Sequence, residues 1–413
     1  MRRALYLLLA GWFAASAQTQ ELAPPAWLPA TVQAAAWLEA DPSVVQARQG
    51  QAAAGHVAQA LAAGSHEWAL RLQAQRRQLQ DGGAASREWL AQLERPLRVN
   101  GKAGLDQRLG DTEQTLARAL LGEARHESAR ALAEQWVSGL AARQRVALAS
   151  EQVALAEANR DAVRQRRRAG DAAWLDEQQA QAELGEAQRE LSLARTLQTK
   201  ALAALQTRFG AELPPAQGLT DVGEPVLAEA DWQARVLAEA DGLKAREALL
   251  QRARLSAARA RADRVADPVL GVFTASEARG NERLLGVSLT LPLGGTHREQ
   301  RSLQLAREAD MAESALEQLR RELLLQARDT WADAQGSRER WRLSRETARL
   351  AAENARLVQR AYALGEADLQ TLLLARRQAG ASSTAALDAQ AEALRGEARL
   401  LVDAHLIWDL AHD

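Results

Sequence analysis

The distribution of proline is the feature that most limits what this chain can fold into. No proline occurs between Pro96 and Pro214, and none occurs after Pro292. Both stretches are rich in Ala, Leu, Arg, Glu and Gln, which favour helices, whereas proline inside a helix is strongly destabilising. One glycine-centred break divides each stretch, at Gly170 and at Gly365, and an acidic residue typical of a helix start follows. The sequence therefore predicts two long helical hairpins; the helix expected over residues 102–169 would be on the order of 100 Å long.

The apolar residues of the second hairpin repeat as they do in coiled coils. Four leucines lie seven residues apart, namely Leu343, Leu350, Leu357 and Leu364. A second series alternates spacings of four and three and mixes large with small side chains: Leu387, Ala391, Leu394, Ala398 and Leu401. Narrow seams of this kind bind neighbouring helices. The heptads alone agree equally well with an exposed helical hairpin that dimerises.

The two halves of the chain are copies of one unit. A shift of 195 residues, without a gap, aligns Trp136 with Trp331, Gly170 with Gly365, and also Leu155 with Leu350, Asn159 with Asn354 and Val163 with Val358. Upstream, WLEADP at 37–42 resembles LAEADG at 237–242, and ERPL at 94–97 resembles TLPL at 290–293. Each structural element should therefore occur twice.

Each copy also contains two stretches with the period of a β-strand. In the first copy, Trp68, Leu70, Leu72 and Ala74 alternate with Arg71, Gln73 and Gln75, and Trp89, Ala91 and Leu93 alternate with Glu88, Gln92 and Glu94. In the second copy, Val269, Gly271, Phe273 and Ala275 share one face, and Leu285, Val287, Leu289 and Leu291 share another. Each run approaches the 9 to 11 residues with which a tilted strand crosses a bilayer, apolar side facing lipid and polar side facing a lumen. The predicted lipid-facing residues are Leu70, Leu72, Leu285, Val287, Leu289 and Leu291, and the predicted lumen residues are Arg71, Gln73, Gln92 and Glu94.

The first residues have the composition of a secretory signal peptide. Arg2 and Arg3 precede an apolar run from Ala4 to Ala15, and small residues allow cleavage after Ala17. The apolar run is too short for a transmembrane helix, which needs about 20 residues. No later segment has 18 uncharged apolar residues, so an exported chain that enters a membrane must do so as a closed β-barrel. The sequence contains no cysteine, which excludes disulfides, thiolate metal sites and a lipid on an N-terminal cysteine.

Four strands are too few for such a barrel, because the smallest membrane barrels have about eight and open strand edges cannot lie in lipid. Several copies must therefore pool their strands. Two copies would give 8 strands and three would give 12, and the larger ring leaves room for an aqueous lumen. The alternative is a pair of soluble amphipathic hairpins packed on the helices.

In the order of these motifs the chain resembles the TolC-like outer membrane factors of Gram-negative efflux and secretion systems. The resemblance covers nearly the whole chain after the leader. It depends on the two-copy layout, on ADPSVVQARQGQAAAG near the start, on a hairpin that ends in LPLGG before a long helix, and on AYALGEADLQTLLLARR. The last motif is similar to the family's tyrosine, glycine and leucine pattern at the periplasmic helix turn, here Tyr362, Gly365, Leu369 and Leu373.

The resemblance implies a fold class that is mainly α with a membrane β part. The duplicated unit of long coiled-coil helical hairpins and β-hairpins would give four strands per chain to a trimeric 12-stranded β-barrel, continued by an α-helical periplasmic tunnel. The location would be the cell outer membrane, with most of the chain in the periplasm. The implied partners are two further copies of the chain, a periplasmic adaptor and an inner-membrane pump of the RND type.

The resemblance also places functional residues at the turns. Adaptor docking falls on Arg167, Arg168, Gly170, Asp171, Tyr362, Gly365, Glu366 and Leu369. The arginines belong to a basic cluster that could equally be a solvated helix face. Family members narrow the tunnel with acidic rings six and nine residues after the second turn glycine, where this chain has Thr371 and Leu374. Asp176 holds the matching place in the first copy, so Asp176 and Thr371 are the gate candidates; an ordinary solvated role for Asp176 is the alternative.

The short chain and LGEADLQTLLLARR are most similar to the CzcC-like branch, which serves heavy-metal cation pumps. Heavy-metal cations are therefore the expected cargo, with drug or small-molecule efflux and type I secretion as alternatives. The chain itself is not expected to bind metal or a cofactor, because His66, His126 and His297 are isolated in the sequence.

Composition and motifs argue against other function classes. The net charge of −1 gives no general attraction to nucleic acid. GQAAAGHV at residue 50 lacks the Lys-Ser/Thr of a phosphate loop, and the sequence contains neither a G-x-S-x-G elbow nor a zincin histidine pair, so the chain is not expected to be an enzyme. A soluble periplasmic coiled-coil adaptor or scaffold remains the alternative of another class; it would lack paired strands of bilayer length.

The sequence thus divides into eight segments. These are the signal peptide 1–17, an N-terminal helical segment 18–64, β-hairpin 65–97, helical hairpin 98–210, linker 211–229, helical segment 230–266, β-hairpin 267–294 and helical hairpin 295–413.

Overall fold

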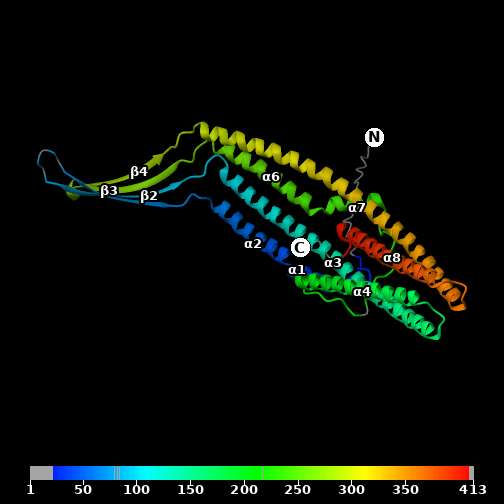
Figure 1. The fold of residues 1–413 in the computed structure, drawn as a ribbon. Helices are drawn as coiled ribbons and strands as arrows, with labels where there is room; N and C mark the ends of the chain where they lie inside the picture. Colours follow the sequence, from blue (N-terminus) through cyan, green and yellow to red (C-terminus); the bar gives the residue numbers. More distant parts are fainter. Residues whose placement is uncertain (1–21, 79, 81, 83, 216, 409–413) are drawn as a thin grey trace, which may run out of the picture.

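The computed structural model describes residues 22–78, 80, 82, 84–215 and 217–408. The predicted signal peptide lies outside these residues. The molecule is elongated, with a β-sheet at one end and the turns of two helical hairpins at the other (Figure 1). None of the helices in the described ranges is both long enough and apolar enough to cross a membrane.

The two halves contain the same elements in the same order. The first half consists of α1 (Thr31–Ala40), α2 (Pro42–Ala63), β1 (Ala69–Arg77), β2 (Ser86–Pro96), α3 (Lys102–Ala169) and α4 (Trp174–Phe209). The second consists of α5 (Glu229–Glu239), α6 (Asp241–Ala262), β3 (Val269–Glu277), the 3₁₀ turn η1 (Ala278–Gly280), β4 (Glu282–Thr290), α7 (Thr296–Leu364) and α8 (Leu369–Asp403). The predicted duplication is therefore present in the fold as well as in the sequence.

The long helices end at the predicted glycines. Gly170 follows α3 with φ 86°, and Gly365 follows α7 with φ 79°. Residues with a side chain rarely adopt this left-handed conformation, so glycine ends the helix here at little cost. Both turns also have the same hydrogen bonds, since the N–H of Asp171 donates to Arg166 O at 2.8 Å and that of Glu366 donates to Ala361 O at 2.9 Å.

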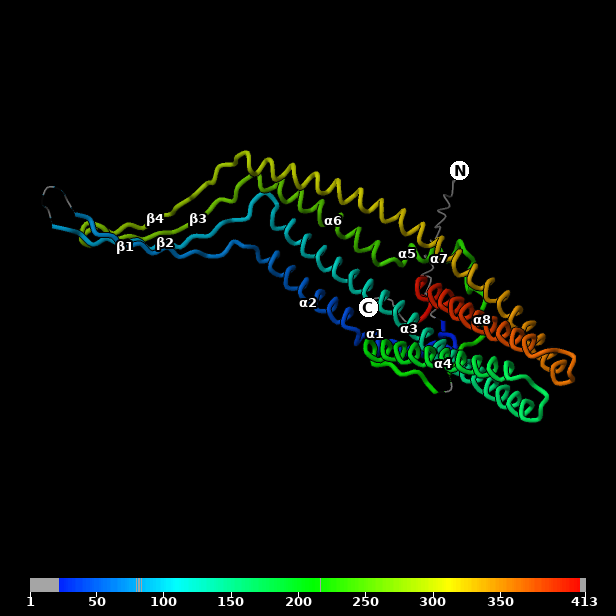
Figure 2. Tube along the Cα trace, viewed as in Figure 1, coloured from blue at the N-terminus to red at the C-terminus, as the bar shows by residue number. Residues whose placement is uncertain are grey.

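The helices form one curved layer that continues the sheet. Next to the sheet the neighbouring helices are α2, α3, α6 and α7, in that order; in the other half of the molecule they are α4, α3, α8 and α7 (Figure 2). The strands are antiparallel in the order β1-β2-β3-β4. One long edge of the layer therefore consists of β1, α2 and α4, and the other consists of β4 and α7.

The core lies in the middle of the molecule around two equivalent tryptophan pairs. The rings of Trp37 and Trp136 are 5.7 Å apart, and those of Trp232 and Trp331 are also 5.7 Å apart. Both members of the second pair follow the first by 195 residues. The sequence motifs align Trp37 with Leu237 instead, because the second copy has five more residues between this tryptophan and the aligned aspartate, which is Asp41 in the first copy and Asp241 in the second.

The two heptad series differ in how far they are buried within the chain. Every member of the series from Leu387 to Leu401 is buried, so this seam of α8 binds neighbouring helices as predicted. The four leucines of α7 at 343, 350, 357 and 364 are instead between 51% and 69% exposed. Among the described residues, no helix covers that seam.

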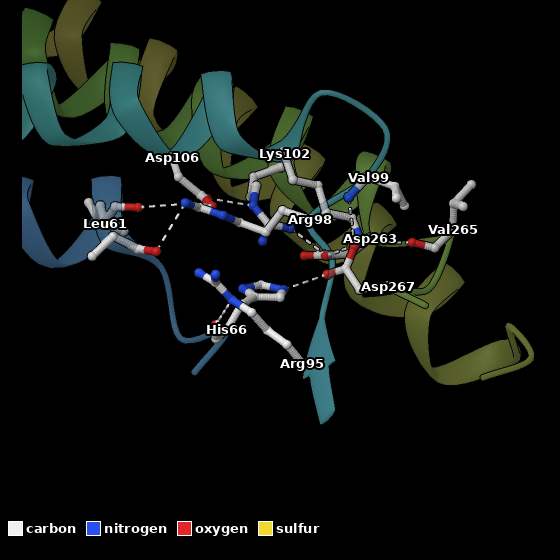
Figure 3. A network of polar contacts seen from close by, with 12 residues as sticks. Leu61, His66, Arg95, Arg98, Val99, Lys102, Asp106, Asp263, Val265 and Asp267 are labelled. Atoms are coloured by element: carbon white, nitrogen blue, oxygen red, sulfur yellow. Dashed lines mark hydrogen bonds and ion pairs between the residues drawn. The ribbon is translucent and has the colours of Figure 1, made fainter. Parts of the chain in front are cut away.

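Figure 3 shows the polar network that joins the strands to the helices. The Lys102 side chain is fully buried, and its Nζ lies 2.8 Å from Asp267 Oδ1 and 3.2 Å from Asp263 Oδ1. His66 bonds the other oxygen of Asp267 at 3.0 Å. Burial alone would raise the pKa of Asp267, but the bonds from Lys102, His66 and the Val99 N–H outweigh it and lower the pKa to about 2. The network links the first copy, through His66 and Lys102, to the second.

A partly buried histidine beside the core should make the stability of the protein sensitive to acid. His405 follows α8, and its ring lies 5.1 Å from that of His126. Burial, and then the neighbouring His126, lower the pKa of His405 to about 4 from the usual 6.5. The unfolded chain therefore binds this proton more readily, so the stability from neutral His405 is complete above pH 6.5 and lost as the pH falls toward 4.

We expect His405→Gln to flatten the fall in thermal midpoint between pH 7 and pH 4.5, with exposed His297→Gln as the matched control. Asp41 and Asp267, whose pKa values are about 2, act only below about pH 4 and do not interfere. Equal slopes for the wild type and His405→Gln, measured by scanning calorimetry, would contradict this assignment.

Candidate functional site

The sheet has an exposed apolar face and an opposite face of mainly polar side chains. The register places Leu72 and Leu285 on one face together with Leu70, Leu93, Leu270, Val272, Val287 and Leu289. These side chains are exposed, Leu72 by 72% and Leu285 by 87%. A water-soluble sheet normally has the opposite arrangement, and an exposed apolar surface of this kind marks contact with a membrane or another protein.

The opposite face carries a connected set of polar side chains, which we call the polar face. Gln92 donates to Ser288 Oγ at 3.0 Å and to Glu94 Oε2 at 2.9 Å, and the Arg71 guanidinium lies 3.8 Å from Glu94. Gln75 donates to Glu88 at 2.8 Å. The four predicted lumen residues therefore share this face, and the six predicted lipid-facing residues lie on or next to the apolar one, with Leu291 just beyond β4.

One sequence interpretation differs from the register. Val269, Gly271, Phe273 and Ala275 do share a face, but it is the polar face, because Gly271 pairs with Glu94 and Phe273 pairs with Gln92. The outward residues of β3 are instead Leu270 and Val272. Phe273 fits there because its ring lies over Gly286, where a Cβ atom would come within 2.5 Å of it.

Both long edges of the layer are open in the single chain. β1 and β4 are the outer strands, so the outward backbone groups of each have no strand beside them in the described chain. The helical parts of the edges also expose apolar side chains, Leu193 and Leu197 on α4 and the four-leucine seam on α7. Unpaired strand edges and exposed heptads both need a partner.

At the other end of the molecule the turns of the two hairpins pack against each other. Leu369, Leu372 and Leu373 of α8 form a small buried cluster with Val163 of α3 and Ala180 of α4. The Arg166 guanidinium lies 5.1 Å from the centre of the Tyr362 ring, a cation–π distance. Of the predicted docking residues, Leu369 is therefore a buried packing residue, and Tyr362 bridges the two hairpins.

The remaining predicted turn residues are exposed or have local roles. Arg167 forms an ion pair with Glu177, and Arg168 is exposed. The gate candidate Asp176 accepts a hydrogen bond from the Ala173 N–H at 3.0 Å, which caps the start of α4. The second gate candidate, Thr371, is exposed, and its N–H donates to Asp368 at 2.7 Å, so that the Asp368 side chain caps the start of α8.

Sequence analysis missed two features at this end. Trp174 and Leu175 are 65% and 57% exposed at the start of α4, although the counterpart of Trp174 in the second copy is the buried Leu369. Burial raises the pKa of Glu183 and lowers that of Arg376, two charged groups between the hairpins. Arg376 follows buried Leu372 by four residues and therefore lies on the same face of α8. This spacing could have indicated in the sequence that Arg376 is partly buried. No group of His, Asp or Glu side chains in the described ranges is placed to hold a metal ion.

The chain has the fold of several solved channels. It matches the outer-membrane channel OprN with a TM-score of 0.78 and 17% identity, over 92% of this chain and 90% of that one. The match to the CmeC outer membrane channel of Campylobacter jejuni has a TM-score of 0.77 and 12% identity, over 92% and 86%. CusC, whose structures concern transmembrane channel formation, matches with a TM-score of 0.76 and 16% identity over 91% of each chain.

No protein-family model and no curated protein sequence matches this chain. The structural likeness shows the fold, and it confirms the predicted class of long helical hairpins combined with a four-stranded sheet.

The buried cluster at the turns should hold the two hairpins together. We expect Leu372→Ala, at a site 1% exposed, to destabilise this end by about 2–5 kcal/mol, because it removes buried apolar atoms and leaves a cavity. Leu374→Ala, at a neighbouring site 64% exposed, is the control. Hydrogen exchange of residues 160–180 and 366–376 should accelerate only in the first variant, and equal exchange in both would count against this role.

Proposed function

We propose that this chain is the outer membrane channel component of a tripartite efflux system, a passive conduit and not an enzyme. The observation that carries the proposal is the inverted sheet, which exposes apolar residues and leaves both strand edges open. In water this surface is unfavourable, whereas in a bilayer the apolar face contacts lipid and the edges pair with other copies. The shared fold with OprN, CmeC and CusC supports the same role.

The two edges differ, so copies would join head to tail and a closed ring would result. The edge formed by β1, α2 and α4 would meet the edge formed by β4 and α7 of the next copy. Three copies give a 12-stranded barrel, continued by a tunnel of helices. The exposed leucine seam of α7 would then pack against α4 of the neighbouring copy, near Leu193 and Leu197.

In this ring the polar face lines the barrel. Arg71, Gln73, Gln92 and Glu94 would contact water in the lumen, and Leu70, Leu72, Leu285, Val287, Leu289 and Leu291 would face lipid. A polar lining with paired charges suits a passage that does not bind its cargo tightly.

The helix turns would be the docking site of a periplasmic adaptor. Exposed Arg168, Asp171 and Glu366 offer polar contacts, and Gly170 and Gly365 let the chain reverse in a tight space. Trp174 and Leu175 add an exposed apolar pair beside them. Asp176 and Thr371 remain gate candidates; the Asp176 side chain also caps the start of α4.

The finer assignments depend on the resemblance of the sequence. Heavy-metal cations are the proposed cargo because the second turn is most similar to the CzcC-like branch, and the pump would be of the RND type. Drug efflux and type I secretion are the alternatives. The leader would be cleaved, and the mature chain would not be lipidated. A soluble periplasmic adaptor or scaffold is the alternative of another class, and the exposed apolar sheet face weighs against it.

Substitution on the two faces of β1 tests the membrane contact. We expect Leu72→Arg to cost roughly 2–4 kcal/mol if the residue lies near the middle of the bilayer. Gln73→Arg, one residue away on the polar face, should be tolerated. The measurement is the amount of heat-resistant protein in purified outer membranes; equal amounts of the two variants would contradict the assignment of the faces.

The oligomer tests the proposal as a whole. The chain, expressed with its leader, should be found in the outer membrane fraction as a trimer whose mass is measured in detergent. The double variant Leu350→Glu/Leu357→Glu should shift the trimer toward monomer, since it buries carboxylates in the seam. Gln359→Glu, on the opposite side of α7, is the matched control. A soluble periplasmic monomer of the wild type would refute the conduit and favour the scaffold.

A further inference from the structure

The four strands sort their charges by sign as well as by face. Every glutamate of the strands lies on the polar face: Glu88, Glu94, Glu277 and Glu282. The apolar face has no carboxylate within the described strands, yet it carries four arginines, Arg76, Arg87, Arg95 and Arg283. A net charge near zero for the whole chain therefore conceals a local excess of positive charge on this face.

Three of these arginines lie in two adjoining rows at the end of the sheet farthest from the helices. Arg76 of β1 is directly opposite Arg87 of β2. Arg283 of β4 lies in the adjoining row across the sheet, which runs through Ser276 to Trp89. All three side chains are exposed. They lie beyond the row that contains both Leu72 and Leu285, on the side away from the helices. We call Arg76, Arg87 and Arg283 the arginine cluster.

On the polar face, a neighbouring arginine does form ion pairs with carboxylates. Arg77, next to the cluster in sequence but on the polar face, lies 3.2 Å from Glu88 and 3.6 Å from Glu277. No described residue forms an ion pair or a side-chain hydrogen bond with the arginine cluster. Since like charges directly opposite each other destabilise a strand pair, the Arg76 and Arg87 arrangement favours an anion from outside the chain.

The position of the cluster indicates which anion that is. If the sheet spans a membrane, as the proposed function requires, the apolar rows lie in the hydrocarbon and the cluster lies at the head groups on the side away from the helices. Exposed Trp89 lies beside it, in the position typical of an interfacial aromatic residue. Arginine binds phosphate through paired hydrogen bonds, and a basic cluster beside a membrane attracts anionic head groups.

We propose that Arg76, Arg87 and Arg283 form a binding site for the phosphate groups of lipid head groups in the outer leaflet. The acyl chains of the same lipid would lie along the apolar rows below, over Leu72 and Leu285. Those chains distinguish a bound lipid from free phosphate, because they add buried apolar contact that an inorganic ion lacks.

Native mass spectrometry of the detergent-solubilised oligomer tests the site. The full-length protein is mixed with equal amounts of bisphosphorylated lipid A and its dephosphorylated counterpart with the same acyl chains. We expect the wild type to retain the phosphorylated lipid at least about tenfold more often. The triple variant Arg76→Gln/Arg87→Gln/Arg283→Gln should lose this preference while remaining oligomeric.

The matched control removes three exposed arginines of the helices, Arg118→Gln/Arg195→Gln/Arg328→Gln, and should keep the wild-type preference. The same preference in the triple cluster variant, or none in the wild-type oligomer, would overturn the proposal. So would loss of the preference when about 10 mM inorganic phosphate is added, because that result identifies a site for the free ion. The wild-type measurement does not depend on how the variants fold. Failure of the proposed function appears separately, as absence of the membrane oligomer.

Discussion

Backbone N–H and C=O groups on the outer sides of β1 and β4 have no partner strand within the described chain, and much of the structure is consistent with this one constraint. Such groups cannot lie in lipid unpaired, so in the proposed conduit strands from other copies of the chain would complete the sheet. The helices continue the same two edges, since α2 and α4 follow the side of β1 and α7 follows the side of β4. One interface along the whole molecule would therefore satisfy the strands and cover the leucine seam of α7.

The contacts that stabilise a single chain lie mainly in the middle of the molecule, away from the two open edges. The two tryptophan pairs and the buried seam of α8 form a core in the middle, joined by the final residues of the described chain up to Trp408. Toward the sheet, Lys102 joins the two repeats of the chain through its ion pairs with Asp263 and Asp267. Toward the turns, the small cluster around Leu372, the Arg166 contact with Tyr362 and the ion pair of Arg145 with Asp388 join the two hairpins. Fewer buried apolar side chains therefore join the two hairpins near the turns than in the middle, which suits the place of a gate in the proposed conduit.

The two repeats of the chain have the same backbone conformation at their helix turns but expose different side chains there. Both turns share glycine geometry and the same capping bonds, yet Leu369 is buried where the equivalent Trp174 is exposed. A partner that contacts both turns would meet Trp174 and Leu175 on the first and Leu364 beside Glu366 on the second. In the proposed ring, divergence of this kind would give each chain two different docking surfaces.

The sequence by itself determined the long helices, their ends at the turns and the number of strands. Proline-free stretches, turn glycines and alternating side chains act through residues that are close together in the sequence, so these signals do not depend on the tertiary structure. It also predicted which residues of β1, β2 and β4 share a face. It could not orient β3, whose two faces are both apolar; pairing with β2 and the space over Gly286 decided that Phe273 lies on the polar side. Nor could it separate a buried heptad from an exposed one, predict the arginines that gather on one face, or find that Lys102 is buried, because each depends on which segments become neighbours. Only the tertiary structure decided those contacts, since burial and pairing are properties of neighbouring segments and not of a spacing along the chain.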